Sequence, residues 1–189
     1  YPHQAGVGRM GRDTGLPGYR GRLNDKCVTI AEVLHDAGYQ TYMSGKWHLG
    51  GKPPERPLAR GFDHAFALLS GASSYFGRWP GRPIVLDAEE YIPPPGFYFT
   101  DAISDQAVAY IKQAKAAPAA APFFLYLAYT APHAPLHAPE PAVQRWLETY
   151  KPGWERIRRE RFERMRKIGL IDSGWELPPS HADVRDWER

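Results

Sequence analysis

The stretch TIAEVLHDAGYQTYMSGKWH, at residues 29–48, contains the signals of a helix followed by a strand. Thr29 and Glu32 fit a capping box, in which the hydroxyl and the carboxylate bind amide groups that lack partners at a helix N-terminus. Helical spacing predicts one apolar stripe, formed by Ile30, Val33, Leu34 and Ala37. Gly38 stands where a left-handed C-terminal cap belongs, and the β-prone residues 39–44 follow it. The stretch therefore predicts an α–β unit.

A second α–β unit follows further along the chain. Residues 102–115 predict a helix with an inward face made by Ile103, Ala107, Val108, Ile111 and Ala114. Residues 123–129 form a continuous apolar run, whose length suits a strand buried on both faces, as in a parallel sheet. The two units together predict an α/β fold with a mostly parallel sheet flanked by helices.

The other segments predict less regular structure. Residues 1–24 are rich in glycine and indicate an irregular surface loop. Residues 51–99 indicate a long excursion with one short strand near residues 83–86. Two further helices are expected at residues 142–150 and 155–168, with Gly169 as the stop of the second, and residues 173–189 are expected to be loosely structured.

Side chains suited to an anion follow the two predicted strands. Lys46 and His48 stand at the end of the first strand, and His133 comes shortly after the second. Ligands of parallel α/β sheets bind beyond the carboxyl ends of the strands, so these three side chains are expected at one edge. In extended chain, alternate side chains share a face, which directs Lys46 and His48 to one ligand and Trp47 into packing. Neighbouring glycines allow close backbone approach: Gly45, Gly50 and Gly51.

A lysine and two histidines at one sheet edge predict an anionic ester hydrolase or an anion-binding site. The ammonium group is a compact charge with three donors, and an imidazole near neutral pH can donate or accept a proton. Four sequence motifs make the interpretation more specific. They are GYQTYMSGKWH at residues 38–48, APHAPL at residues 131–136, RGFD at residues 60–63 and YPHQAGV at residues 1–7.

These motifs resemble the type I sulfatase family, and most closely its bacterial arylsulfatases. The resemblance runs from residue 1 to about residue 139 and more loosely through the charged helix after it. It implies an alkaline-phosphatase-like fold, incomplete in this chain. Residues 1–189 would be part of one catalytic domain, without the N-terminal nucleophile segment and the C-terminal remainder.

The resemblance also implies a reaction and a role for each site residue. Family members hydrolyse sulfate esters with a formylglycine nucleophile, made from Cys or Ser by a formylglycine-generating enzyme, beside a calcium ion. Lys46 would bind a sulfate oxygen and the formylglycine, and His48 would hold a hydroxyl of the aldehyde hydrate and remove its proton. His133 would bind the sulfate and protonate the leaving oxygen, whereas His137 has no assignable catalytic counterpart.

Several residues that this chemistry needs cannot be placed in the chain. The C/S-x-P-x-R motif is absent, and Cys27 lies in DKCVT, so it is interpreted as a small packing residue. Neither the nucleophile nor any calcium ligand can be assigned, and we therefore expect the 189 residues alone to be inactive. The acidic segment at residues 87–90 is interpreted as a solvated turn, and Tyr75 and Trp79 either line an aromatic substrate pocket or simply pack.

The composition of the chain bears on whether it forms a packed core, contains a disulfide or crosses a membrane. Hydrophobic residues make up 43% of the chain, which is enough for a packed core, and the net charge is +3. A single cysteine excludes an intrachain disulfide, and no apolar run approaches the roughly 20 residues of a membrane span. The expected partner is a sulfate ester, either a small molecule or a glycan, with no nucleic acid and no membrane. A phosphomonoesterase or phosphodiesterase of the same superfold and a non-catalytic anion-binding module remain as alternatives, and the compartment stays open.

Overall fold

The computed structural model describes residues 1–116, 121–185 and 187, which form two compact units, Tyr1–His137 and Ala138–Arg189. The first unit holds the sheet and its helices, in the order α1 (Ile30–Asp36), β1 (Gln40–Lys46), η1 (Pro53–Glu55), η2 (Pro57–Arg60), β2 (His64–Leu68), β3 (Ile84–Leu86), β4 (Glu89–Tyr91), α2 (Phe99–Ala116) and β5 (Phe123–Ala128). The second unit holds α3 (Glu140–Tyr150) and α4 (Trp154–Lys167). Membership of residues 1–189 in one catalytic domain stays a prediction.

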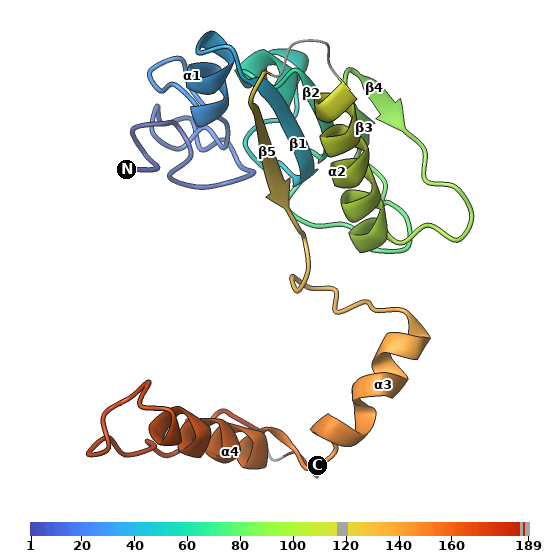
Figure 1. Cartoon of the computed structure of the whole chain (residues 1–189). Coiled ribbons are helices and arrows are strands. Elements are labelled where there is room, and N and C mark those ends of the chain that lie inside the picture. Colours follow the sequence, from blue (N-terminus) through green and yellow to red (C-terminus); the bar gives the residue numbers. More distant parts are fainter. Residues whose placement is uncertain (117–120, 186, 188–189) are drawn as a thin grey trace. The chain divides into compact units, whose positions relative to one another are not determined.

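The sheet of the described chain has five strands in the order β4-β3-β2-β1-β5 (Figure 1). β1 pairs in parallel with β2 and β5, whereas β3 pairs antiparallel with β2 and β4. Four of these strands therefore run in one direction and β3 runs against them, which confirms the predicted mostly parallel α/β sheet. Both α–β units are also confirmed, because α1 precedes β1 and α2 precedes β5.

The sheet has an apolar core on each face, because side chains alternate along its strands. One core joins the strands to α2 and is made mainly by Tyr42, Phe66, Leu68, Phe99, Ile103 and Tyr110. The other joins them to α1 and includes Ala31, Met43, Trp47, Phe62, Ala65 and Ala67. On the α2 side, the Ser44 hydroxyl also donates a hydrogen bond of 2.8 Å to the Ile103 carbonyl. The end of β1 is therefore held from both faces.

The capping box and Gly38 correctly predict the two ends of α1. The Thr29 hydroxyl accepts from the Glu32 amide at 3.1 Å, and the Glu32 carboxylate accepts from the Thr29 amide at 2.6 Å. At the other end, Gly38 has a φ of 86° and its amide donates to the His35 carbonyl. The amide after it donates to the Leu34 carbonyl, which completes a Schellman-type cap.

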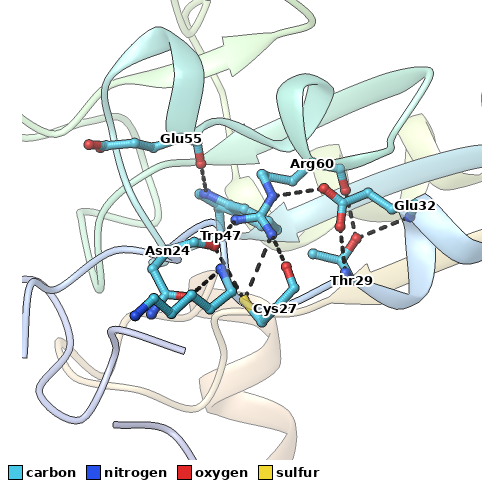
Figure 2. Close-up of polar contacts among 8 residues, drawn as sticks. Asn24, Cys27, Thr29, Glu32, Trp47, Glu55 and Arg60 are labelled. Carbon is cyan, nitrogen blue, oxygen red and sulfur yellow. Dashed lines mark hydrogen bonds and ion pairs between the residues drawn. The ribbon is translucent and has the colours of Figure 1, made fainter. Parts of the chain in front are cut away.

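Arg60, the last residue of η2, ties α1 to the segment before it (Figure 2). Its side chain donates to the Glu32 carboxylate at 3.0 Å and to the carbonyls of Asn24 and Cys27 at 3.3 and 2.8 Å. The Thr29 hydroxyl donates to the Arg60 carbonyl at 2.8 Å. Cys27 is half-buried beside this guanidinium, in keeping with the predicted packing role. The RGFD motif is thus used to build the fold.

The apolar stripe predicted for α1 is wrong. Ile30 and Val33 are 64% and 56% exposed, and Ala37 is exposed as well, whereas Ala31 is fully buried. A Cβ atom on Gly61 would lie only 2.7 Å from the carbonyl carbon of Ala31. The chain at Gly61 therefore presses against the first turn of the helix, and only a small side chain fits the face that it covers.

The inward face predicted for α2 is correct at three positions, because Ile103, Ala107 and Ala114 are buried. Val108 is 49% exposed, so its assignment to that face is wrong. Tyr110 is buried instead, and its ring stacks on Tyr42 of β1 with centroids 5.0 Å apart. The large aromatic contact sets the rotation of the helix about its axis.

Residues 51–99 contain more regular structure than the expected single strand. The strand near residues 83–86 is confirmed as β3, but β2 and β4 were not predicted. β2 has the sequence HAFAL, and alanine is a weak strand former, so only its pairing with β1 makes this segment a strand. Residues 1–24 contain turns, bends and one isolated bridge between Val7 and Tyr19, which confirms the predicted irregular loop.

The apolar run of the second unit forms β5, but its burial was predicted wrongly. Phe123, Tyr126 and Leu127 are 38%, 45% and 41% exposed. Within the described residues, β5 pairs with β1 on one side only and is therefore an edge strand. An apolar sequence allows a strand to be buried, but whether the strand is buried depends on the strands and helices that pack beside it.

The unit Ala138–Arg189 has the predicted helices. α3 and α4 match the expected segments to within two residues, and Gly169, with a φ of 70°, follows the end of α4. Trp154 at the start of α4 meets Trp187 edge to face, with ring centroids 4.9 Å apart. Across the described ranges, no helix is both long enough and apolar enough to cross a membrane.

Candidate active site

Lys46 is the last residue of β1 and lies opposite Leu68 of the neighbouring parallel strand. The next residue, Trp47, is 5% exposed, and its indole N–H donates to the Glu55 carbonyl at 3.0 Å. Trp47 therefore points into packing, as predicted, and fixes the direction in which the chain leaves the strand. Gly45 allows β1 to lie close to β5, because a Cβ atom there would come 1.9 Å from the Ala128 carbonyl oxygen.

His48 stands in an unusual backbone conformation beside two glycines. Its φ is 57°, so the expectation that Lys46 and His48 belong to one extended segment is wrong. A Cβ atom on Gly71 would lie 2.5 Å from the imidazole ring of His48, and one on Gly11 would lie 2.8 Å from its Nε2 atom. The imidazole is thus held between two backbone segments that only glycine permits. The left-handed backbone conformation of His48, rather than the alternation of side chains along a strand, sets the direction of this ring.

His133 lies in the loop after β5, and two backbone contacts hold it there. Its amide donates to the Thr130 carbonyl at 3.0 Å, and the Tyr75 hydroxyl donates to its carbonyl at 2.8 Å. The Nδ1 atom of His133 is 2.6 Å from the Ala134 carbonyl oxygen. Because a carbonyl can only accept, Nδ1 carries a proton, and Nε2 is left to face a ligand.

His48 and His133 line the same cavity, which has a volume of about 590 Å³. This is the size range of sites for small-molecule ligands, roughly 300–1,000 Å³. Arg82 also lines the cavity and was not predicted, because its segment carries no motif that points to a ligand. Its guanidinium donates to the Ala72 carbonyl and lies over the Trp79 ring. Lys46 is not among the described residues that line this cavity.

Lys46 nevertheless acts on His48 through its charge. Burial, followed by the electrostatic effects of Lys46, His133 and Arg82, lowers the pKa of His48 below its ordinary value. Burial also lowers the pKa of Lys46. The structure thus places His48 and His133 at one cavity, and Lys46 and Arg82 act on His48 by charge; a shared catalytic role of Lys46, His48 and His133 stays a prediction. The arrangement suits an anion, which would offset this concentration of positive charge.

A comparison with known families agrees with this arrangement. The family model described as "Sulfatase" matches residues 1–173. This chain belongs to the sulfatase family. It is 38% identical to an arylsulfatase of Klebsiella aerogenes and 34% identical to an uncharacterized sulfatase of Schizosaccharomyces pombe, with 98% of the chain covered in each case. The chain spans 41% and 37% of the lengths of these two relatives.

Solved structures show the same fold. The crystal structure of Ps i-CgsB in complex with k-i-k-neocarrahexaose matches 77% of this sulfatase chain and 35% of its own, with a TM-score of 0.64 and 29% identity. The structure of BT4656 in complex with its substrate, D-glucosamine-2-N,6-O-disulfate, matches 68% of the chain and 23% of its own, with a TM-score of 0.52 and 27% identity. The alkaline-phosphatase-like α/β fold expected from the motifs is therefore confirmed, in incomplete form.

The described residues of this sulfatase chain bear on a possible calcium site. In the part of the chain that the structure describes, no group of three or more His, Cys, Asp or Glu side chains could hold a metal ion. Asp87, in the acidic segment, instead accepts from the Ala65 amide at 2.8 Å and lies 3.0 Å from the His64 ring. Glu90 pairs with Arg78. These contacts fit the predicted solvated turn, and no chemical step is assigned to a metal.

The lowered pKa of His48 leads to a pH prediction. We expect the NMR titration midpoint of its ring to lie below the ordinary value of 6.5, and to rise toward 6.5 in Lys46→Met, which removes a neighbouring charge. The folded state binds this proton less readily than the unfolded state. The resulting stabilisation is therefore complete above about pH 6.5 and is lost as the pH falls through the folded pKa.

Lys112→Met is the matched control, because Lys112 is exposed on α2 and does not contribute to the shift at His48. It should leave the midpoint of His48 unchanged. A midpoint at or above 6.5 in the unsubstituted protein would contradict the lowering of the His48 pKa by burial and neighbouring charge.

Proposed function

We propose that this protein hydrolyses sulfate esters and that Lys46, His48 and His133 handle the sulfate group. One observation carries the proposal: in a chain of the sulfatase family, His48 and His133, which follow two different parallel strands, line one cavity, and the charge of Lys46 at the end of β1 acts on His48. A phosphate ester carries a similar charge, but no observation in this chain favours phosphoryl transfer over sulfuryl transfer.

Lys46 would stabilise the transition state by charge. Negative charge builds on the sulfuryl oxygens as the ester bond breaks, and a preorganised cation at that position lowers the barrier more than it favours the bound substrate. Its partial burial at the end of β1 strengthens this effect, because a charge that is shielded from water interacts more strongly with its neighbour.

His48 would act as a base. Its lowered pKa keeps the ring neutral near pH 7, so that Nε2 or Nδ1 can accept a proton from a hydroxyl group at the reaction centre. Gly11 and Gly71 hold the ring in place and limit its rotation. A base that is fixed before the substrate binds needs no rearrangement during the reaction.

His133 would bind the sulfate and protonate the leaving oxygen. The contact of Nδ1 with the Ala134 carbonyl leaves Nε2 as the atom that donates, when the ring is protonated, to the oxygen of the departing alcohol. The Tyr75 hydroxyl, which donates to the His133 carbonyl, positions the loop that carries the ring.

The remaining catalytic groups of this proposal cannot be assigned to residues of this chain. By the family resemblance, a formylglycine would supply the nucleophilic hydroxyl and calcium would be the expected cofactor, and no residue of this chain is assigned to either. Cys27 is not a candidate for conversion, since its thiol lies between the Asn24 carbonyl and the Arg60 guanidinium and no Pro-x-Arg pattern follows it. A formylglycine-generating enzyme is therefore the proposed maturation partner, and the 189 residues alone are expected to be inactive.

The proposed substrate is a sulfate ester of a small molecule or a glycan. This follows from the relatives, of which one is an arylsulfatase and another, BT4656, was crystallised with a sulfated sugar substrate. The aromatic side chains of Tyr75, Phe76 and Tyr98 pack together beside the His133 loop, where His137 stacks on Phe76 at 5.8 Å.

The test is to express the complete gene together with a formylglycine-generating enzyme and to assay 4-nitrophenyl sulfate and 4-nitrophenyl phosphate side by side. We expect turnover of the sulfate well above that of the phosphate. Preferred turnover of the phosphate would replace the proposal with a phosphoesterase. Failure of protein with confirmed formylglycine to cleave either ester would reject arylsulfatase and arylphosphatase activity.

A further inference from the structure

The wall of the cavity beyond His48 and His133 is strongly basic. Five side chains that line it are cationic and two are carboxylates; they are Arg12, Arg20, Arg22, Lys52 and Arg82, against Asp13 and Glu55. The proposed roles of Lys46, His48 and His133 do not use any of these residues. An excess of positive charge within one cavity calls for an anionic partner.

Both carboxylates of the wall are already engaged. Asp13 lies 3.3 Å from Arg20 and 3.4 Å from Arg22, and it also accepts from the Gly15 amide at 2.8 Å. The hydrogen bond from Gly15, together with the two arginines, lowers the pKa of Asp13 and keeps it ionised. Glu55 pairs with Arg22 at 3.1 Å. The carboxylates therefore orient Arg20 and Arg22 but leave the other cations uncompensated.

Arg12, Lys52 and Arg82 take part in none of the ion pairs found among residues 1–116, 121–185 and 187. Arg82 has other contacts, with the Ala72 carbonyl and the Trp79 ring. Arg12 and Lys52 are exposed side chains on the cavity wall. These two cations are thus the ones available to a ligand.

The position of Arg12 relative to His48 follows from backbone packing. Gly11, the residue before Arg12, lies against the Nε2 atom of His48, since a Cβ atom there would be 2.8 Å away. Gly21 packs on the backbone of Arg12, where a Cβ atom would lie 2.6 Å from the Arg12 amide nitrogen. On the other segment, Lys52 follows His48 closely in sequence, and its amide donates to Glu55 at 3.1 Å. Both cations therefore flank the histidine site.

We propose that Arg12 and Lys52 bind a second anionic group of the substrate, a sulfate or a carboxylate on the part of the molecule that leaves. The inference rests on the proposed function, because it takes the group beside His48 and His133 to be the sulfate ester. A volume of about 590 Å³ accommodates more than a single sulfate group. The guanidinium of Arg12 can bind either kind of oxyanion through two parallel hydrogen bonds. The substrate class is therefore a sulfate ester with at least two negative charges.

Binding of non-hydrolysable sulfonates tests this inference without any need for turnover. Benzene-1,3-disulfonate presents two anionic groups and benzenesulfonate presents one. Calorimetry on the complete gene product should show tighter binding of the disulfonate, and Arg12→Gln/Lys52→Gln should weaken disulfonate binding about fivefold, given the strength of exposed ion pairs. Benzenesulfonate affinity should change by less than twofold. The preference for the disulfonate should also shrink as salt is added.

Lys26→Gln is the matched control, because Lys26 is an exposed cation of the same unit that does not line the cavity. It should leave both affinities unchanged. Equal weakening of both sulfonates by the double variant would mean that Arg12 and Lys52 only attract anions in general, and this would overturn the inference. Equal affinity of the unsubstituted protein for the two sulfonates would overturn it as well.

Turnover of 4-nitrophenyl sulfate and the binding preference for the disulfonate together separate this inference from the proposed function. If 4-nitrophenyl sulfate is cleaved but the disulfonate has no advantage, the second anion site is wrong and the sulfatase activity stands. If the disulfonate preference depends on Arg12 and Lys52 but no sulfate ester is cleaved, the site stands as an anion-binding site and the proposed hydrolysis fails.

Discussion

Replacement of Lys46 by alanine is expected to lower kcat for 4-nitrophenyl sulfate by about 100- to 1,000-fold, the usual effect of removing one preorganised group that stabilises charge in the transition state. Lys46 ends β1, where the sheet holds the backbone and burial lowers the pKa of its ammonium. A mobile surface cation could not substitute for it, because the benefit comes from a charge that is already in place. The measurement is kcat and KM for the complete gene product carrying formylglycine.

The split between kcat and KM distinguishes catalysis from simple attraction of the substrate. We expect the loss mainly in kcat, since charge on the sulfuryl group is greatest in the transition state. Lys112→Ala on α2 removes an exposed lysine far along the chain and should leave both constants unchanged. His133→Ala should also reduce kcat, and less severely for an ester whose leaving group needs no proton. Unchanged turnover in Lys46→Ala would remove Lys46 from the catalytic site.

Replacement of Arg60 by methionine is expected to lower the free energy of unfolding by about 2–4 kcal/mol, somewhat less than the loss of one partner from a fully buried ion pair. Arg60 is 8% exposed and is bound to the Glu32 carboxylate and to the carbonyls of Asn24 and Cys27 (Figure 2). Methionine keeps the apolar stem but leaves these acceptors unpaired. The measurement is the urea midpoint, followed by circular dichroism.

A double variant shows whether the ion pair causes this loss. Arg60→Met/Glu32→Gln removes the charge that Arg60 leaves behind, so it should be less destabilising than the sum of the two single variants. Arg9→Met, at an exposed arginine of the same unit, should be within about 0.5 kcal/mol of the unsubstituted protein. A loss below about 1 kcal/mol in Arg60→Met would mean that water replaces the guanidinium at little cost.

This prediction also separates two kinds of motif residue. GKWH and APH carry His48 and His133, which line the cavity, whereas RGFD builds the fold around them. Asp63, the last residue of RGFD, accepts from the amide and the hydroxyl of Thr41 at 2.8 and 3.0 Å, which anchors the start of β1. Loss of Arg60 should therefore reduce stability, while loss of Lys46 should reduce catalysis with the fold intact.

The elements that could be predicted from the sequence are those with local causes. The capping box at Thr29 and Glu32, the left-handed Gly38 and the apolar spacing of α2 all act within a few residues of themselves. β2 was missed because its HAFAL sequence has little strand preference without β1 beside it. The burial of β5 was wrong because the number of neighbouring strands is not a property of the strand itself.

The sequence by itself determined the chemistry available to the site: which residues carry charge, and that Lys46, His48 and His133 stand at or after the ends of two apolar, strand-forming segments. Only the tertiary structure decided how His48 is aimed and what surrounds it. Gly11, Gly71 and Arg82 reach this ring from separate parts of the chain. A sequence motif contains residues that are close together along the chain. The electrostatic field and the shape of a cavity, in contrast, are set by residues that become neighbours only after folding.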